Sequence, residues 1–473
     1  MDRIKKRGVS RIRLMRPYLT KKSKRSGRSK TKRARRSSRS SRNSHGSRSS
    51  HSSRNSHGSR NSHSSRRNSP PIGLAVNTTN PANARSVLSV LHSHLIDPKS
   101  KSHPVHRFTS KELTKMFAPI SREFAETVRN APLRNTETKV TAPVKWRSLF
   151  PSALALRLSP KAPLKEVADL AEMGDLAYLE WLSLEGHKMD DPAFPKLVAA
   201  FPRLSHLTSL SLEGVNFTEA GQCTALLGAT SPSLTSLSLW GTRGFKFTDL
   251  VGVLPRFRHL QHLNVSGHYD KDILSVLGPA LGSFRELQEL DIGGNLLGPE
   301  GAEALSHIVV RMPHLRVLKA GFNRMGEART GDGGIETLMK ALRTCPDLEH
   351  LNLQSNVLGD VGILRLSHPL SECKALKYLN LSSNNIYDRD TPDPEDGTLK
   401  SPLRVLVESL PVSLETLYLY ETVINDKGIA TFLEKLPHMK HLTLLNLSVY
   451  PSPGKVAIRA KAAEVLPGCK VVL

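Results

Sequence analysis

The segment Leu348-Glu-His-Leu351-Asn-Leu353-Gln-Ser-Asn356-Val-Leu358 contains a leucine pattern that returns along two thirds of the 473-residue chain. Its core, L-x-x-L-x-L, sometimes with another apolar residue in last place, also begins at Leu179, Leu207, Leu234, Leu260, Leu287, Leu315, Leu376, Leu414 and Leu442. Most copies follow the previous one by 26–28 residues. Each unit of such a repeat can bury its apolar edge only against the next unit. The pattern therefore predicts an extended repeat protein.

Each unit predicts one strand and one helix. The alternating L-x-L suits a short strand with every second side chain in the core. An asparagine recurs eight residues after the first leucine, at Asn295, Asn323, Asn356 and Asn384, where an amide can satisfy backbone groups as the chain turns. Helical patterns follow at 301–308, 362–366 and 428–433. We therefore expect an α/β fold with a parallel sheet on one face. The same frame is present at 151–158, and a truncated last strand is predicted at 467–473.

These features resemble the leucine-rich repeat family and, by unit length, its ribonuclease-inhibitor-like subclass. The full motif L-x-x-L-x-L-x-x-N-x-L spans Leu287 to Leu297 and Leu348 to Leu358. The resemblance covers roughly residues 150–473 and implies a horseshoe-shaped solenoid with the sheet on its concave face. The asparagine position departs from the motif in the outer units, which carry His187, Val215, Thr242, His268, Thr422 and Tyr450. A fold of this kind hosts many binding roles and does not by itself define a function.

The positive charge is concentrated at the amino terminus. Residues 1–70 contain 24 of the 68 Lys and Arg residues and one of the 42 acidic residues, so the remaining chain is almost neutral. Residues 1–72 are rich in Arg, Ser and His and nearly free of aromatic residues. Such a composition predicts a disordered basic tail, because it cannot bury enough apolar surface to offset the entropy of ordering.

The tail resembles a two-part nuclear localisation signal, which implies recognition by an importin. The residues that carry this resemblance are Lys21, Lys22, Lys24, Arg25, Lys32, Arg33, Arg35 and Arg36. Non-specific contact with nucleic acid phosphates is an alternative, and it would depend strongly on salt. A solvated segment without a dedicated partner is the remaining interpretation.

Residues 73–130 predict short amphipathic helices that form a helical cap over the open amino-terminal end of the solenoid. Within them, residues 84–130 also resemble an F-box, a three-helix motif that docks the Skp adaptor of a ubiquitin ligase. The usual Leu-Pro opening is missing, and the first connection, from Ile96 to Arg107, is long for that motif. Residues 131–149, with Pro132 and Pro143, predict a linker before the leucine-rich repeat domain at 150–473.

The concave face is the predicted binding surface. Parallel strands about 4.8 Å apart would line a surface suited to a protein rather than to a small molecule. Aromatic side chains are favoured anchors at protein interfaces. The residues predicted to contact a partner are Trp181, Trp240, His262, Phe322, His350, Tyr378, Tyr418 and Tyr420. The alternative is that neighbouring rows or the amino-terminal helices cover some of them.

No catalytic motif, cofactor site or metal site is predicted. Gly293-Gly294 lacks the Lys-Ser/Thr of a phosphate-binding loop, and His259 with His262, like His438 with His441, has no fitting partner ligand. No apolar stretch approaches the roughly 18 residues that cross a bilayer, and the amino terminus is a poor signal peptide. Four widely spaced cysteines favour burial as small hydrophobes in a reducing compartment. We therefore expect an intracellular protein, cytoplasmic and/or nuclear.

The sequence favours a non-enzymatic protein that binds a protein partner on the concave face. The alternative is an F-box-type substrate receptor of a ubiquitin ligase. A GTPase-activating protein similar to the Ran activator is a lesser alternative, because that family shares the repeat subclass but carries an acidic tail.

Overall fold

The computed structural model describes residues 139–326, 334–422, 426–434, 436–447 and 455–472. The chain divides into two units, Met1–Leu74 and Ala75–Leu473, and every described residue belongs to the second. The predictions for the basic tail with its localisation signal, and for the cap or F-box segment at 73–130, lie outside the described residues.

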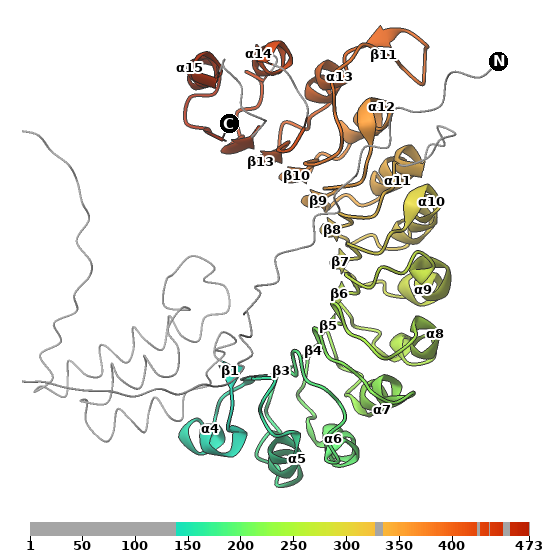
Figure 1. Cartoon of the computed structure of the whole chain (residues 1–473), viewed down its shortest axis with the longest axis vertical. Helices are drawn as coiled ribbons and strands as arrows, with labels where there is room; N and C mark the ends of the chain where they lie inside the picture. The colour runs from blue at the N-terminus through green and yellow to red at the C-terminus, as the bar shows by residue number, and fades with distance from the viewer. Residues whose placement is uncertain (1–138, 327–333, 423–425, 435, 448–454, 473) are drawn as a thin grey trace, which may run out of the picture. The chain divides into compact units, whose positions relative to one another are not determined.

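The described part of the second unit is built on one parallel sheet of 13 strands that pair in chain order (Figure 1). The strands are β1 (Lys139–Val140), β2 (Ala155–Leu158), β3 (Trp181–Ser183), β4 (Ser209–Ser211), β5 (Ser236–Ser238), β6 (His262–Asn264), β7 (Glu289–Asp291), β8 (Val317–Lys319), β9 (His350–Asn352), β10 (Tyr378–Asn380), β13 (Thr416–Tyr418), β14 (Leu444–Asn446) and β15 (Lys470–Val472). The predicted parallel sheet is confirmed, and so is the truncated last strand.

The register of the sheet aligns the repeats residue by residue. Leu210 pairs with Leu237, Leu290 with Leu318, and Leu379 with Leu417, so the fourth position of each motif meets the fourth position of the next. These leucines are at most 1% exposed. One continuous apolar core therefore runs along the described solenoid, as the period of the sequence predicts.

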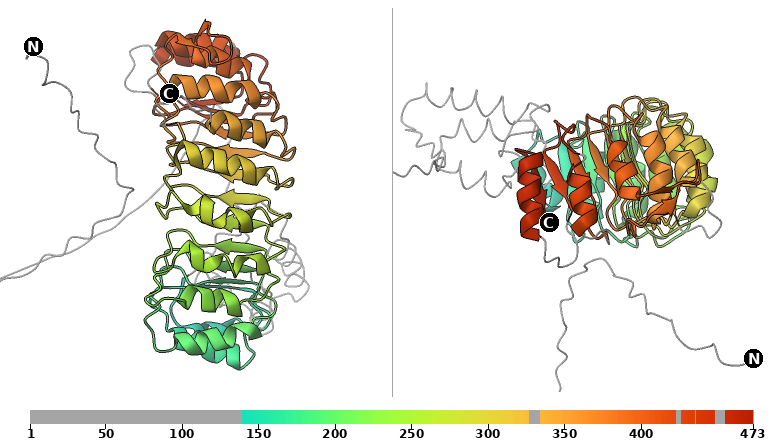
Figure 2. Two further views of the ribbon diagram at one scale, coloured as in Figure 1. Left: turned by 90° about the vertical axis from the view of Figure 1, so that its right-hand side faces the viewer. Right: turned by 90° about the horizontal axis from the view of Figure 1, so that it is seen from above.

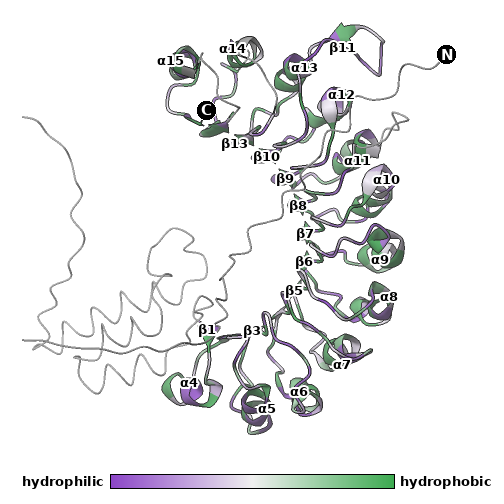
Figure 3. Ribbon diagram, viewed as in Figure 1, coloured by the Kyte–Doolittle hydropathy of each residue, from purple (hydrophilic) through white to green (hydrophobic). Residues whose placement is uncertain are grey.

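Helices connect the strands and line the outer, convex side of the curve, while the strands line the inner side (Figures 1 and 2). They are α4 (Pro143–Leu149), α5 (Leu164–Glu172), α6 (Phe194–Ala200), α7 (Gln222–Ala229), α8 (Phe247–Leu250), α9 (Ile273–Leu281), α10 (Gly298–Val309), α11 (Gly334–Leu342), α12 (Gly359–Leu370), α13 (Pro402–Glu408), α14 (Asp426–Glu434) and α15 (Lys455–Val465), with 3-10 turns at Phe201–Arg203 and Leu254–Arg256. Hydrophobic and hydrophilic residues alternate along the helix ribbons (Figure 3), as expected for helices with one buried face.

A ladder of buried asparagine side chains closes the turns after the strands. The Asn356 amide nitrogen donates to the carbonyls of Ala320 (3.0 Å) and Leu353 (2.9 Å), and its oxygen accepts from the backbone N–H of Asn323 (3.1 Å). Asn295, Asn323 and Asn384 repeat this arrangement, and all four are fully buried. The predicted role of the asparagine is confirmed. Outside the ladder, Thr242 donates to the carbonyl of Leu212 at 2.8 Å.

The ordered repeats begin earlier than the sequence predicts. Residues 139–149, predicted as part of a linker, form β1 and α4, and β1 pairs with β2. Pro143 stands in the first turn of α4, where a missing N–H has no cost, so it starts the helix rather than marking a linker. Arg147 is buried and donates to the carbonyls of Phe150 and Ala153. Burial against the first repeat stabilises this segment. Its 11 residues are too few to contain a repeat period, so the sequence does not reveal this burial.

The acidic insertion between the repeats of β10 and β13 folds back as a small antiparallel pair, β11 (Thr391–Pro392) and β12 (Leu399–Lys400). The Asp360 carboxylate holds its first residues by accepting from the backbone N–H groups of Tyr387 (2.8 Å) and Asp388 (3.1 Å). The insertion therefore lies beside α12 and leaves the main sheet uninterrupted.

Candidate functional site

The concave face consists of the side chains that point away from the leucine core. Counting from the first leucine of the motif, they occupy positions two, three and five on the strand and seven and eight in the turn after it. All the predicted contact residues take such positions, and each is at least partly exposed: Trp181, His262, His350 and Tyr378 at three, Tyr418 at five, Trp240 and Tyr420 at seven, and Phe322 at eight.

Four of these residues meet in one group, which we call the aromatic cluster: His350, Tyr378, Tyr418 and Tyr420. The His350 and Tyr378 rings are stacked, with centroids 3.9 Å apart and planes 5° apart. Tyr378 contacts Tyr418 at 5.5 Å, and Tyr418 meets Tyr420 edge-on at 6.3 Å. The cluster forms because β9, β10 and β13 are neighbours in the sheet, although 70 residues of sequence separate its ends.

Polar side chains brace the cluster from one side. The Gln354 amide donates to the Tyr420 hydroxyl, and Asn380 donates to the Gln354 oxygen at 3.3 Å. Burial raises the pKa of both Tyr378 and Tyr420, so both phenols stay neutral at physiological pH. Tyr420 is thus held by a side-chain hydrogen bond, and all four cluster residues remain partly exposed. Sequence analysis missed Gln354, although position seven of the motif is a concave position.

The other predicted contact residues lie apart from the cluster. Trp181 is on β3 and His262 on β6, seven and four strands before β10. Trp240 is 52% exposed and lies over the turn at Gly267, where an added Cβ would come within 3.0 Å of its indole nitrogen. Phe322, in the turn after β8, is 56% exposed. The predicted residues do lie on the concave face, but the sequence did not reveal which of them come together.

Phe322 has a backbone conformation that disfavours a large side chain. Position eight takes a positive φ in nine successive repeats, and in the first five of them it is glycine: Gly186, Gly214, Gly241, Gly267 and Gly294. The next four carry Phe322 (φ 61°), Ser355, Ser383 and Glu421 (φ 55°) instead. A left-handed conformation costs a non-glycine residue roughly 1–2 kcal/mol. Phe322 gains little burial in return, so packing does not account for its strained conformation.

Charged side chains fill the concave face between β6 and β10. Glu289 is paired with Lys319 and lies 3.4 Å from His262. The hydrogen bond from His262, together with Lys319, lowers the pKa of Glu289 to about 2. On the next repeats Glu349 pairs with Arg316 (2.6 Å) and Lys377 (3.5 Å). These carboxylates are therefore neutralised within the protein, and no pair of them forms an acid–base dyad.

We predict that His350 makes the protein sensitive to mild acid. Burial, with the nearby Lys319, lowers the pKa of His350 to about 4. Below the ordinary histidine pKa near 6.5, the unfolded chain takes up a proton that folded His350 does not, so stability falls between about pH 6.5 and pH 4. His350→Phe should reduce this fall, because it keeps the ring stack without the titrating group. Thermal melting from pH 7 to pH 4.5 measures it, and equal slopes for both proteins would contradict the prediction.

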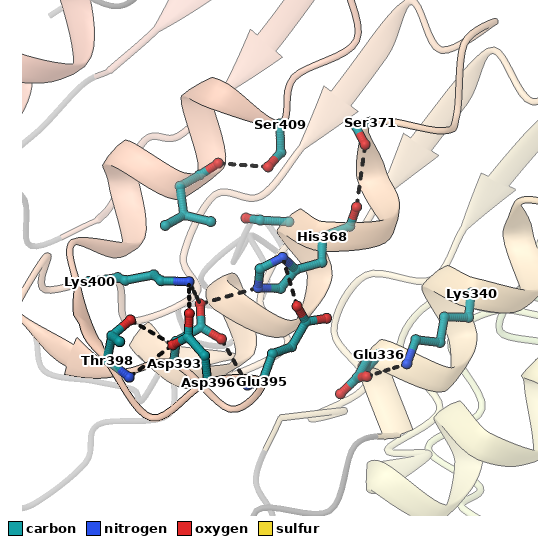
Figure 4. A network of polar contacts seen from close by, with 12 residues as sticks. Glu336, Lys340, His368, Ser371, Asp393, Glu395, Asp396, Thr398, Lys400 and Ser409 are labelled. Carbon is teal, nitrogen blue, oxygen red and sulfur yellow. Dashed lines mark hydrogen bonds and ion pairs between the residues drawn. The ribbon is translucent and has the colours of Figure 1, made fainter.

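His368, Asp393 and Glu395 form a second polar group, on the convex side (Figure 4). Their ligand atoms lie within 4.8 Å of one another, which is compatible with a metal site. However, Lys400 lies 3.0 Å from the fully buried Asp393 carboxylate and 2.8 Å from Asp396. The ammonium group already balances Asp393 within the insertion. The His368 ring nitrogen, 3.2 Å from the Asp393 carboxylate, links α12 to the insertion. Sequence analysis missed it, because it depends on how the insertion folds.

Comparison with known proteins gives similarity to leucine-rich repeat proteins. The family model described as Leucine Rich repeat matches residues 285–306, 344–367 and 372–389. The solved structure of the leucine-rich repeat-containing protein LegL7 from Legionella pneumophila is 18% identical, with 61% of this chain and 88% of that chain covered and a TM-score of 0.38. The TLR13–ssRNA13 complex is 17% identical (69% and 51% covered, TM-score 0.39). An internalin, inlF, from Listeria monocytogenes is 16% identical (66% and 97% covered, TM-score 0.32).

None of the helices in the described ranges is long and apolar enough to cross a membrane.

Proposed function

We propose that this leucine-rich repeat solenoid is a non-enzymatic binding module that holds a protein partner on its concave face. The aromatic cluster is the observation that carries the proposal. It offers partly exposed rings from three adjacent strands that pack against one another, and Gln354, bonded to Asn380, donates to the Tyr420 hydroxyl. Rigid aromatic side chains give large contact area at little cost in conformational entropy, which makes them the commonest anchors of protein interfaces.

The strained Phe322 supports the same proposal. It lies on the same face, after β8, and β9 and β10 with the first half of the cluster follow directly in the sheet. Position two of β8, β9 and β10 carries Arg316, Glu349 and Lys377, whose ion pairs form a charged strip beside the aromatic residues. A face with aromatic anchors on several strands and a charged strip beside them suits a folded or extended protein segment across those strands.

The proposal is tested by capturing partners with the full chain and with matched variants. We expect Tyr378→Ala combined with Tyr418→Ala to lose the proteins that the wild-type chain captures. Tyr178→Ala is the control, because Tyr178 is also an exposed aromatic residue (67%) but lies in the turn before β3. Equal capture by all three proteins would contradict concave-face binding.

Phe322→Gly provides a sharper test. We expect it to weaken capture while changing the free energy of unfolding by no more than about 1 kcal/mol, because release of the left-handed strain offsets the lost packing of a half-exposed ring. Denaturant unfolding of the variant measures the second part. A loss well above that value would mean that Phe322 is a packing residue.

For residues 84–130 we propose docking of the Skp adaptor, as their resemblance to an F-box implies. One described feature favours this over a cap: α4 already packs against α5 at the amino-terminal end of the repeats, and the α5 side chain Glu166 accepts from the Val144 N–H at 3.1 Å. We expect the full chain to capture purified Skp adaptor and Leu113→Asp with Phe117→Asp to abolish capture. Failure of the wild-type chain to bind the adaptor would refute it.

For the basic tail we propose nuclear import through the two clusters Lys21–Arg25 and Lys32–Arg36, which gives a protein found in the nucleus as well as the cytoplasm. Replacing the eight basic residues by Ala in a fluorescent fusion should remove nuclear accumulation. If accumulation persists, the tail has another partner, and salt-dependent binding to RNA or DNA is the next assay.

A further inference from the structure

We infer that the aromatic cluster, together with Glu415 and Glu421, binds arginine side chains carried by a basic segment of the partner protein. The inference rests on the proposed concave-face binding and assigns its chemistry. It follows from three features of this end of the sheet: the partly exposed rings, two carboxylates without a cationic partner among the described residues, and the left-handed backbone of one of these two glutamates.

The rings form a surface suited to a flat cation. His350 and Tyr378 are stacked in parallel, and Tyr418 and Tyr420 turn at an angle beside them, so that ring faces and edges border one another. The face of a tyrosine ring attracts cations through its quadrupole, and a planar guanidinium can also stack on it. In the described structure Arg389 already makes this contact with Tyr387, 4.7 Å from the ring centroid.

Two carboxylates near the rings are not neutralised. Glu415 lies at position two of the repeat whose position five is Tyr418, and Glu421 directly follows Tyr420. Both are exposed, and neither takes part in an ion pair among the described residues. The concave carboxylates Glu185, Glu289 and Glu349, in contrast, are each bonded to a Lys or Arg of the protein itself. The negative charge left at the carboxyl-terminal end of the face therefore complements a cationic ligand.

Glu421 has a strained backbone conformation and an oriented side chain. Its φ of 55° is left-handed, at the position where five other repeats have glycine. Its side chain is oriented by the Ser383 hydroxyl, which donates to one carboxylate oxygen at 2.7 Å and leaves the other oxygen available. Ser383 is itself left-handed. Neither side chain is needed to make the turn, since glycine makes it elsewhere, so this pair indicates a preorganised hydrogen-bond acceptor.

Arginine fits these groups better than lysine does. A guanidinium can stack on a ring and at the same time donate from its edge to a carboxylate, and it is more weakly hydrated than an ammonium. A neutral apolar side chain would use the rings but leave Glu415 and Glu421 without a role. The strip of paired charges from Arg316 to Lys377 would then border the neighbouring residues of the same segment.

The test uses the full chain and three labelled peptides of Gly and Ser that carry four regularly spaced arginines, four lysines or four citrullines. Citrulline has the shape of arginine but no charge. The whole chain carries a net charge of +26, nearly all of it in residues 1–70, so a cationic peptide gains no general electrostatic attraction and its binding indicates a local site. Fluorescence anisotropy should show the arginine peptide binding about tenfold more tightly than the citrulline peptide and several-fold more tightly than the lysine peptide.

Matched variants locate the site. We expect Tyr418→Leu to weaken arginine-peptide binding about tenfold and Tyr418→Phe to stay within about twofold of wild type, because phenylalanine keeps the ring face. Glu415→Gln with Glu421→Gln should weaken it about tenfold, whereas Glu213→Gln, on the distant β4 repeat, should not. Equal binding of the three peptides, or equal loss for Leu and Phe at Tyr418, would overturn the inference.

Two further outcomes are distinguishable. If the arginine peptide binds only after removal of residues 1–72, the occupant is the chain's own basic segment, and the assignment to another protein is wrong. If the peptides fail to bind while Tyr378→Ala with Tyr418→Ala still abolishes partner capture, concave-face binding stands and the arginine chemistry is wrong. If Tyr378→Ala with Tyr418→Ala reduces neither partner capture nor arginine-peptide binding, both proposals are refuted.

Discussion

Asn356→Ala is expected to lower the free energy of unfolding by roughly 3–5 kcal/mol. The substitution removes five hydrogen bonds of a fully buried amide, and the groups that it bonded are affected differently. The carbonyls of Ala320 and Leu353 each keep a second donor, Asn323 and Asn384 respectively. The backbone N–H groups of Asn323 and Met325 lose the acceptor that Asn356 provides, and an unsatisfied buried donor costs about 1–3 kcal/mol.

The control for Asn356 is Asn352→Ala, four residues earlier on β9. The Asn352 oxygen accepts from the Gln354 N–H at 3.0 Å, but the side chain is on the concave face and water can replace it. We expect a loss of about 1 kcal/mol or less. Urea unfolding followed by circular dichroism compares the two variants. Similar losses would mean that the asparagine ladder contributes no more than an exposed hydrogen bond.

Gly244→Ala is the second large effect, with an expected loss of about 3–5 kcal/mol. A Cβ added to Gly244 would lie 1.7 Å from the carbonyl oxygen of Phe217, far closer than any real contact. The neighbouring backbone cannot move easily, because the Phe217 N–H donates to the Arg243 carbonyl at 3.0 Å and Asn216 bridges to Arg243. The substitution must therefore separate two adjacent repeats at this edge.

Gly241→Ala separates the clash from the backbone strain. Gly241 also has a positive φ, but nothing lies within 4 Å of the position of its Cβ. Its substitution should lower the free energy of unfolding by about 1–2 kcal/mol, which is the backbone strain of a left-handed alanine alone. Melting temperatures of the two single variants give the comparison. If Gly241→Ala proves as destabilising as Gly244→Ala, the close approach to Phe217 is not the cause.

The periodicity of the sequence was sufficient to predict the fold from the first repeat to the last. Leu182, Leu290 and Leu417 recur in one register because each repeat has the same neighbour on either side, so a local pattern becomes a global structure. Prediction failed where the pattern stops. The α4 helix has a proline at its start and one buried arginine, Arg147, and its burial against the first repeat is invisible in its own seven residues.

The position of these aromatic residues on the concave face was predictable, but the cluster that they form was not. That His350, Tyr378, Tyr418 and Tyr420 point away from the leucines follows from alternation along a strand. That they touch one another depends on β10 pairing with β13 across a long insertion, and on side-chain conformations that only packing determines. The pattern also gave no sign that position eight is left-handed at Phe322 and Glu421, since neither residue type favours that conformation.

By itself, the sequence determined a curved stack of strand–helix units and the separation of a basic segment from a nearly neutral body. The spacing of apolar residues and the net charge of a segment can both be read from the residue order, without coordinates. Only the tertiary structure decided which exposed rings share a surface, which carboxylates are paired with a cation of the protein and which turns are strained. Those properties depend on distances between residues remote in sequence, and a linear pattern does not contain such distances.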